Sequence, residues 1–466
     1  MLEALGITAS LALLIYFAYR GYSVIFFAPI FALLAALTQG LPVMPTYTEL
    51  FMVKAAIYVK NFFPIFMLGA VFGKIMEESG MAKSIASALI RSLGPRHAIL
   101  STVLSAAILT YGGVSMFVVV FAVYPFAAAL FREADIPKKL IPATIVLGAF
   151  TFTMDSLPGS PQIQNIIPSK FLGTTIYAGP YLGCFIALVM FATGMMWLTY
   201  RANKARTQGE GYGDHTLNEP HLAGLKLPSW QISLLPLLAV LVINYLGNKV
   251  IDWNPDILNP IIDMKLPLAA SSIKTVISTW SLIIAVAVGI VIAGSVGFFS
   301  MPKGSMGKAI SLGAVGSLLA IMNVASEVGY GNVISALPGF KSIIAGVMDM
   351  KIGGDNPLTS MAVTINIICG ITGSASGGVS IALDLFSKMW LDWAGAVNMS
   401  PEILHRFASI ASGGFDTGPH NGAIITLLAV CGLTHKQSYP DIFAMTLLKI
   451  LMVVIALVFV SVLGFA

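Results

Sequence analysis

Two aspartates lie in short motifs that interrupt otherwise apolar segments of this 466-residue sequence. Asp155 begins "DSLP", Asp416 begins "DTGP", and His420 directly follows the second motif. An ionised carboxylate inside a bilayer costs at least about 2.5 to 3.5 kcal/mol, so its presence there indicates a functional role. Asp155 and Asp416 could exchange a proton or help to bind a cation, and His420 could exchange a proton near neutral pH. Alternatively, each aspartate could cap the half-helix that follows it, and His420 could be a structural histidine.

The composition predicts a protein that crosses a membrane many times. The chain is 57% hydrophobic and 10% charged, with a mean hydropathy of +0.87. Its first apolar run is followed by Arg20 and at once by a second run, which favours a first span over a cleaved signal peptide. Because about 20 apolar residues cross a bilayer, we predict spans at 4–19, 23–38, 50–77, 180–200, 229–247, 276–299, 305–330 and 440–465.

Gly and Pro interrupt four further apolar segments, which are predicted to be hairpins or broken helices. Segments 98–131 and 357–396 are predicted as re-entrant hairpins, and 138–175 and 402–434 as broken helices. Lys and Arg in the loops favour both termini outside, the first hairpin entering from the cytoplasm with its tip at 111–113, and the second entering from outside. Three basic residues deviate from this charge rule: Lys351, Lys388 and Arg406.

Three short motifs recur in the same order in the two halves of the chain. "GGVS" occurs at 112–115 and 377–380, an offset of 265 residues, and "DSLP" at 155–158 has the partner "DTGP" at 416–419, an offset of 261. The Glu-x-Gly triplets at 78–80 and 327–329 give an offset of 249. Because each predicted copy crosses the membrane an odd number of times, the two copies must point in opposite directions.

Inverted repeats with paired broken helices are typical of secondary transporters, whose substrate site lies near the midplane where the breaks meet. We therefore predict an all-α polytopic membrane protein built from two inverted-topology repeats, each with transmembrane helices, a re-entrant hairpin and a broken helix. The first repeat is placed at 1–200, a polar cytoplasmic linker at 201–228, and the second repeat at 229–466. His215 and His221 in the linker are predicted to be solvated, with no role as metal ligands.

Hairpin tips and helix breaks also predict where a substrate binds. A helix break exposes N–H groups and the positive end of a helix dipole, and such an end can receive a carboxylate. Small residues allow close approach, and hydroxyl or amide groups could bind a hydroxy acid. The candidate substrate-binding residues are Gly112, Gly113, Ser115, Ser156, Gly377, Gly378, Ser380, Thr417 and Asn421, and the candidate proton-coupling residues are Asp155, Asp416 and His420.

Several other polar residues are interpreted structurally. Glu78 and Glu327 stand beside glycines at predicted span ends and are interpreted as interfacial or capping residues. Asp384 and Lys388 are four residues apart on the second hairpin and are predicted to neutralise each other. The three cysteines, which lie in apolar segments without a CxxC motif, are interpreted as packing residues.

The sequence resembles the gluconate permease family (GntP) of the ion transporter superfamily over essentially its whole length. The resemblance is carried by "TYGGVSMFVVVFAVYPFAAALF" at 110–131, by "ASGGFDTGPHNGAIITLLAVCGLTHKQSYPDIF" at 411–443, and by the overall layout. The chain is most similar to the D-beta-hydroxybutyrate permease branch. The sugar-acid branch typically has "PPHPGP" where this chain has "DSLPGSPQ" at 155–162, a difference that favours a smaller hydroxy acid.

The resemblance implies proton-coupled uptake, a homodimer and an elevator mechanism. It implies a transport domain from 95–200 and 350–466 and a scaffold mainly from 1–80 and 229–330. The expected function is symport of a proton with a small hydroxy-monocarboxylate, such as 3-hydroxybutyrate, into the cell across the bacterial inner (cytoplasmic) membrane. The alternatives are symport of gluconate or another sugar acid, and sodium-coupled carboxylate transport. Neither a cofactor nor a metal ion is expected.

Other function classes fit the sequence less well. An intramembrane hydrolase, with Ser380 near His420, is the alternative class, but no HExxH or GxSxG motif is present. A channel would fit the hairpins, yet paired acids beside anion-receptive helix ends fit coupled transport better. "GSMGKA" at 304–309 lacks the spacing and the hydroxyl of a Walker motif. The net charge of +5 is spread over short loops, which argues against nucleic acid as a partner.

Overall fold

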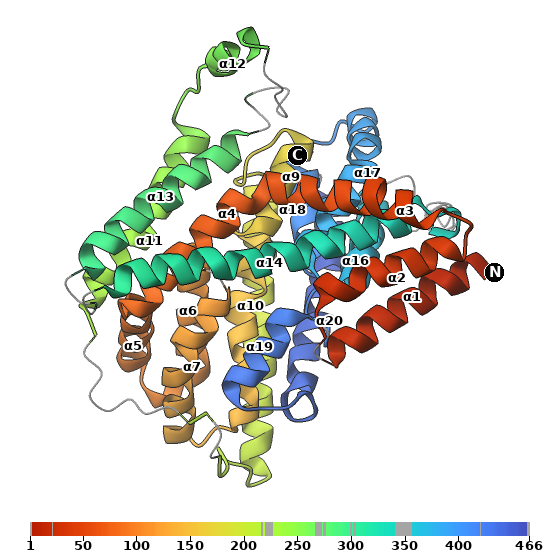
Figure 1. Ribbon diagram of the computed structural model, residues 1–466. Helices are drawn as coiled ribbons and strands as arrows, with labels where there is room; N and C mark the ends of the chain where they lie inside the picture. Colours follow the sequence, from red (N-terminus) through yellow and green to blue (C-terminus); the bar gives the residue numbers. More distant parts are fainter. Residues whose placement is uncertain are drawn as a thin grey trace.

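The computed structural model of the protein is helical, with no strand among the residues that it describes (Figure 1). The described residues are 2–20, 22–114, 116–215, 218–219, 227–265, 273, 276–298, 301, 304–340, 357–419 and 421–463. The all-helical class predicted from the sequence is therefore confirmed for this part of the chain.

The helices follow one another in a similar order in the two halves. The first half contains α1 (Leu2–Tyr19), α2 (Val24–Leu37), α3 (Val43–Pro45), the π-helical η1 (Thr46–Met52), α4 (Val53–Glu78), α5 (Met81–Leu93), η2 (Pro95–His97), α6 (Ala98–Tyr111), α7 (Met116–Glu133), η3 (Lys138–Leu140), α8 (Ile141–Ala149), η4 (Phe152–Ser156), α9 (Ile163–Leu172) and α10 (Pro180–Thr207). The second half contains α11 (Trp230–Lys249), η5 (Pro255–Leu258), α12 (Asn259–Asp263), α13 (Ile277–Gly297), α14 (Ser305–Ala336), α16 (Pro357–Thr372), α17 (Ala375–Ala396), α18 (Pro401–Ser412), α19 (Gly422–Cys431) and α20 (His435–Leu463).

All eight predicted spans coincide with helices. Six of the described helices are long and apolar enough to cross a membrane: Val43–Glu78, Pro180–Thr207, Trp230–Lys249, Ile277–Gly297, Ser305–Ala336 and His435–Val462. The other two predicted spans coincide with the apolar helices α1 and α2. The protein is thus a multi-pass membrane protein.

Both predicted hairpins are pairs of helices joined by tight turns. Helices α6 and α7 meet at a turn that contains Gly112 and Gly113, as predicted, and Gly113 has φ +90°. Helices α16 and α17 meet at Gly373, which has φ +66°, and Ser374, which caps α17 by accepting a hydrogen bond from the Gly377 N–H. A positive φ costs glycine little, so both turns place a glycine where the chain reverses.

The second turn lies about one helical turn before the position that the "GGVS" match predicts. Gly377, Gly378 and Ser380 belong to α17 and do not form the tip. With the offset of 261 residues taken from the aspartate motifs, Gly112 corresponds to Gly373, which is the residue at the observed turn. The "GGVS" match, with its offset of 265, therefore pairs a turn with a helix and is wrong as a structural alignment.

The third sequence match is also wrong as a structural alignment. Helix α4 ends at Glu78, and Gly80, with φ +76°, precedes α5. Glu327 and Gly329 instead lie inside α14, which continues to Ala336. Glu78 fits its interpretation as a helix-end residue, because it pairs with Lys74 at 3.0 Å. Glu327 does not fit it, because its carboxyl is inside a long helix.

Both broken helices are present. Helix α8 ends at Ala149, the π-helical turn η4 carries Asp155, and α9 begins at Ile163. Helix α18 ends at Ser412, and α19 begins at Gly422 after a segment with three glycines and a proline. The predicted N-cap role of the aspartates is wrong, because Gln162 precedes α9 and Asn421 caps α19.

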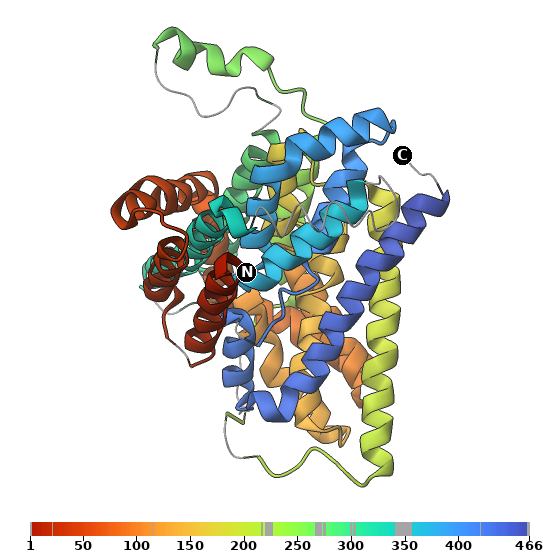
Figure 2. The same ribbon diagram turned by 90° about the vertical axis from the view of Figure 1, so that its right-hand side faces the viewer.

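Two sets of long helices frame the breaks. Helix α14 packs along α4 and also contacts α2, whereas α10 packs against α20, where Phe185 and Phe459 stack with ring centroids 4.5 Å apart (Figure 2). Arg201 of α10 donates to Asp441 of α20 through two nitrogens, at 2.6 and 3.1 Å. The hairpins and broken helices lie between these sets.

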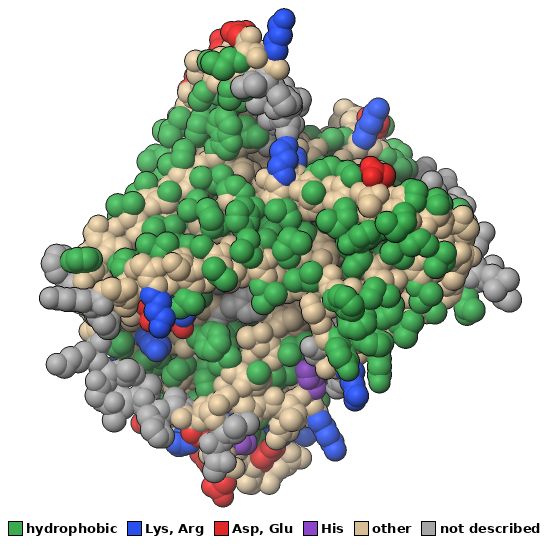
Figure 3. Space-filling model, viewed as in Figure 1, with side chains coloured by type: hydrophobic (Ala, Val, Ile, Leu, Met, Phe, Trp, Pro, Cys, Tyr) green, Lys and Arg blue, Asp and Glu red, His purple; other side chains and the backbone are tan. Residues whose placement is uncertain are grey.

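Hydrophobic side chains cover much of the face formed by α13, α14, α1 and α2 (Figure 3). Exposed apolar residues on α14 include Val315, Leu318 and Leu319, and Val291 is exposed on α13. This surface suits contact with lipid, which agrees with the predicted spans.

The linker packs against helix ends more closely than a solvated loop would. The Glu219 carboxylate contacts Lys138 Nζ at 2.8 Å, and it also pairs with Arg132 and accepts a hydrogen bond from the Tyr212 hydroxyl. Burial, together with the Glu219 carboxylate, raises the pKa of Tyr212 above its ordinary value. His215 Nε2 lies 3.0 Å from the Tyr212 carbonyl oxygen, and His221 is outside the described residues.

Candidate functional site

A single lysine brings the two motif aspartates together. Lys449, in the middle of α20, donates a hydrogen bond to Asp416 Oδ1 at 2.7 Å, and its Nζ lies 3.5 Å from Asp155 Oδ2. It also donates to the Phe150 carbonyl at the end of α8, at 2.7 Å. All three ionisable side chains are at least nine-tenths buried. The breaks therefore meet at a charged cluster with two carboxyls and one ammonium group.

The two aspartates differ in their closest partners. Asp155 Oδ1 accepts a hydrogen bond from the Ser156 hydroxyl at 2.7 Å, so its nearest donor is neutral. Asp416 has the Lys449 ammonium at hydrogen-bonding distance instead. Buried ions need close compensating partners. The negative charge of Asp416 is thus better compensated. Protonation of Asp155 costs less free energy than protonation of Asp416, because it does not remove a close charged hydrogen bond.

A second buried cation lies beside this cluster on α18. Arg406 is fully buried, and its guanidinium donates to the carbonyls of Ile176 and Ala178 and to Asn165 Oδ1, at 2.8 to 2.9 Å. These acceptors are all neutral. Since Arg406 lies inside the protein and not in a loop, its deviation from the charge rule for loops has a structural reason. Lys388, the second deviating residue, is exposed on α17, and Lys351 is outside the described residues.

Hydrogen bonds of Asn165 and His405 connect the first break to α18. Asn165 Nδ2 donates to the carbonyls of Ser160 and Ile176, at 2.8 and 3.0 Å. The His405 ring contacts Thr174 Oγ1 at 2.6 Å and Asn165 Oδ1 at 3.3 Å. Together with Arg406, these residues fix the loop that follows Asp155.

Asn421 ties the second break to the second hairpin. Its Oδ1 caps α19 by accepting from the Ala423 N–H at 2.7 Å, and its Nδ2 donates to the carbonyls of Asp416 and Gly373, at 2.7 and 3.0 Å. The hairpin turn and the aspartate are thus held by one amide. Its hydrogen-bonding groups are already engaged, so its contribution to a site would be to position the neighbouring groups.

The remaining predicted residues lie at varying distances from the aspartates. Ser156 is part of the cluster, whereas the Thr417 hydroxyl contacts Thr446 Oγ1 at 2.6 Å. A Cβ atom at position 112 would overlap Leu237 of α11. Gly112 therefore allows the first hairpin tip to pack against the second half of the chain. Gly378 packs against Cys369 of α16, and Ser380 is buried two residues further along α17. Ser115 and His420 are outside the described residues.

The predicted neutralisation of Asp384 by Lys388 is wrong. Asp384 Oδ2 instead pairs with Lys54 of α4 at 2.6 Å. The spacing of four residues allowed an intrahelical pair, but a lysine from the neighbouring helix is the partner. This ion pair connects α4 to the second hairpin. Cys369 and Cys431 are buried as predicted, while Cys184 is exposed.

Sequence reasoning missed Lys449, Arg406 and His405 as members of this region. For Lys449 a signal was present, because a lysine in the middle of a 28-residue apolar span indicates a functional or paired residue. Arg406 was noticed only as a deviation from the charge rule. Asn165, in the first turn of α9, carried no local signal.

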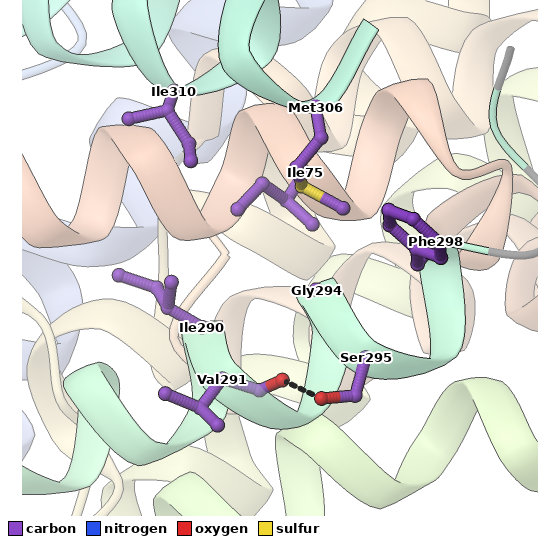
Figure 4. Close-up of a pocket in the computed structure, with 8 residues that line it drawn as sticks. All are labelled: Ile75, Ile290, Val291, Gly294, Ser295, Phe298, Met306 and Ile310. Atoms are coloured by element: carbon purple, nitrogen blue, oxygen red, sulfur yellow. Dashed lines mark hydrogen bonds between the residues drawn. The ribbon is translucent and has the colours of Figure 1, made fainter. Parts of the chain in front are cut away.

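An apolar pocket of about 500 Å³ lies away from these residues, between α4, α13 and α14 (Figure 4). Its lining consists of Ile75, Ile290, Val291, Gly294, Ser295, Phe298, Met306 and Ile310. The Ser295 hydroxyl donates to the Val291 carbonyl at 2.8 Å, so the one polar side chain is already satisfied. The pocket offers nothing that would recognise a carboxylate.

Comparison with known proteins gives concordant results. The profile of the GntP family permeases matches residues 4–464. The chain is 46% identical over 460 residues to an uncharacterized transporter, YxjC, of Bacillus subtilis (strain 168), with 96% of each chain covered. Its fold is similar to the crystal structure of the Alcanivorax borkumensis YdaH transporter, with a TM-score of 0.55, 13% identity, and 89% of this chain and 88% of that chain covered.

Proposed function

The chain belongs to the GntP family of permeases and is thus a transporter and not an enzyme, and from this premise we propose that it is a symporter that takes up a small hydroxy-monocarboxylate together with a proton. The substrate is 3-hydroxybutyrate or a close analogue, and the membrane is the inner membrane of a bacterium. The observation that carries the proposal is the cluster in which Lys449 is shared by Asp155 and Asp416.

The charge of the cluster supports coupling to a proton. If both aspartates are ionised, two carboxylates share one close ammonium group, because Arg406 is engaged with neutral acceptors. A proton on Asp155 leaves the Asp416–Lys449 pair as a compensated unit. Burial then favours the protonated state while the site is closed, and opening to water favours release of the proton. Asp155 is therefore assigned as the proton carrier and Asp416 as the fixed partner of Lys449.

The positions of the breaks support a substrate site beside this cluster. The starts of α17 and α19 lie close together, because Asn421 joins the Gly373 turn to the Asp416 backbone. A helix start favours a carboxylate. The hydroxyl groups of Ser374 and Ser376 at the start of α17 suit the short polar body of a hydroxy acid. These groups are assigned to the substrate, and His420 is kept as an auxiliary proton group.

The inverted repeats, the division into scaffold and transport domain, the elevator movement and the homodimer are part of the same proposal. In support, each half has the order of span, hairpin, broken helix and final long helix. The long helices α4 and α14 pack together, as equivalent scaffold elements would. The elevator movement and the homodimer are inferred from the resemblance to the family.

Uptake by proteoliposomes tests this function. Purified protein is reconstituted and supplied with labelled 3-hydroxybutyrate under an inward proton gradient, an inward sodium gradient or no gradient, with unlabelled gluconate as competitor. Accumulation with the proton gradient alone, and no effect of gluconate, is the expected result. Accumulation driven by sodium alone would overturn proton coupling, and strong competition by gluconate would reassign the substrate to the sugar acids. Lys388→Met, which changes an exposed lysine, is reconstituted in parallel as the control with which the variants described below are compared.

A further inference from the structure

Glu327 places a carboxyl group of α14 against the start of α17. The carboxyl oxygen Oε2 lies beside Gly377, the residue whose N–H is bound by the capping Ser374. This oxygen is buried and makes no hydrogen bond. A buried polar atom without a partner lowers the stability of the fold by about 1 to 3 kcal/mol. A ligand group that bonds to this oxygen would recover that free energy.

A second buried polar group without a partner faces the same helix start. The Tyr58 hydroxyl of α4 makes no hydrogen bond of normal length and angle, although the tyrosine is only 2% exposed. It lies near Ser376 in the first turn of α17 and near the Glu327 carboxyl. A donor from α4, an acceptor from α14 and the positive end of the 22-residue helix α17 thus converge.

We propose that Glu327, Tyr58 and the start of α17 form the subsite for the carboxylate of the substrate, and that Glu327 takes up a proton when this subsite is filled. This inference rests on the proposed function and adds a second proton to it. The ionised Glu327 carboxylate occupies the positive end of α17 as a tethered anion. A substrate carboxylate can take its place only when Glu327 is neutral, because two anions would otherwise repel each other beside one helix start.

Within the described part of the chain no cation pairs with Glu327, and the Ser374 hydroxyl is the polar side-chain group that faces its carboxyl. Helix α4 presents Tyr58, and its nearby Lys54 is paired with Asp384 of α17. Among the described residues, α2 and α16 contribute no charged side chain, and the thiol of Cys369 is the titratable group on α16. Glu49 of η1 is exposed. A substrate with a hydroxyl and a carboxylate supplies what is missing: an acceptor for Tyr58 and a group that bonds with Glu327.

Proton uptake on binding gives a measurable slope. For each proton taken up with the substrate, affinity falls up to about tenfold per pH unit as the pH rises. With one proton on Asp155 and one on Glu327, the slope approaches two in logarithmic units. In Glu327→Gln, which resembles the neutral acid, the expected slope approaches one, and binding at high pH is tighter than that of the unmodified protein.

The experiment is equilibrium binding of labelled 3-hydroxybutyrate to the purified full-length protein in detergent, from about pH 5.5 to about pH 8.5. Glu49→Gln is the control for removal of a carboxylate, since Glu49 is exposed, and it should leave the slope unchanged. Tyr58→Phe should lower affinity several-fold at every pH without changing the slope, while Tyr200→Phe, at an exposed position, should change neither.

The outcomes separate the inference from the function on which it rests. An unchanged slope in Glu327→Gln, with normal binding by the unmodified protein, overturns the inference and leaves the symporter intact. A complete loss of binding in folded Glu327→Gln at all pH values also overturns it, because the neutral form is the one expected to bind. No binding by the unmodified protein at any pH, together with no uptake by proteoliposomes, overturns the proposed function and the inference with it.

Discussion

The two helix breaks carry equivalent aspartates but surround them differently. In the first break, residues 150–162, Asp155 is held by the Ser156 hydroxyl and lies 3.5 Å from Lys449 Nζ. In the second break, residues 413–421, Asp416 is 2.7 Å from the same Nζ. The comparison teaches that repetition of a motif fixes the place of a carboxyl group in the fold and leaves its charge state to the partners around it.

Unequal partners give the two aspartates separate roles. A buried carboxylate with a close ammonium partner stays ionised and contributes to structure. One whose closest donor is a hydroxyl pays a larger desolvation cost in its ionised form, so a change in solvent access can shift its protonation. This division predicts structural failure at the second break and functional failure at the first.

The largest expected effect is that of Lys449→Met, which removes the cation that both breaks share. Loss of one partner from a buried ion pair costs about 3 to 5 kcal/mol, so we expect a large fall in the midpoint of thermal unfolding in detergent and loss of transport. Adding Asp416→Asn should restore part of the stability, because the orphaned carboxylate is then neutral. Lys388→Met is the matched control. Equal stability of Lys449→Met and the control would contradict the central role of the cluster.

Substitution of the aspartates one at a time sharpens the comparison. Asp416→Asn breaks a charged hydrogen bond worth about 1.5 to 3 kcal/mol and should lower stability by a similar amount. Asp155→Asn should stay within about 1 kcal/mol of the unmodified protein, since it keeps a partner for Ser156. It should still exchange labelled for unlabelled substrate, but its accumulation with a proton gradient should fall, because the proton on Asp155 is no longer carried. The reverse pattern in paired unfolding and uptake measurements would exchange the two roles.

Close contact between the breaks gives a third test. A Cβ at Gly413 would overlap Asp155 Oδ2 and approach Lys449 Cε, so Gly413→Ala should force the breaks apart. Overpacking of this kind costs about 1 to 3 kcal/mol. Gly422→Ala is the matched control, because nothing lies within 4 Å of a Cβ there and Gly422 begins α19. Thermal unfolding of both variants checks the difference, and a neutral Gly413→Ala would mean that the breaks can separate freely.

Local sequence signals located the helices, the hairpins and both breaks. Apolar runs set the long helices, and Gly and Pro marked the interruptions because they disfavour continuous helix. The same signals placed Gly112 at the observed turn. They placed the second tip wrongly, at Gly377, because four identical letters outweighed the offset of the aspartate motifs, which is the one that the structure follows.

The partners of the polar side chains could not be predicted from local signals. Lys449 reaches Phe150 across 299 positions of the chain, and Lys54 reaches Asp384 across 330. Glu327 looked like a helix-end residue because Gly329 follows it, yet the helix continues past both. Periodicity and spacing report what one segment prefers, whereas the identity of the nearest buried charge depends on how distant segments pack.

The smallest expected effect compares the hydroxyl residues that follow the two aspartates. Ser156 donates to Asp155, whereas the Thr417 hydroxyl contacts Thr446. Ser156→Ala removes a hydrogen bond that favours ionised Asp155, worth about 1 kcal/mol, so proton-driven uptake should persist to a higher pH, by less than about one unit. Thr417→Val should lower stability by a similar amount without moving the pH profile. Initial uptake rates across pH for both variants check this, and equal shifts in the two would show that the breaks titrate alike.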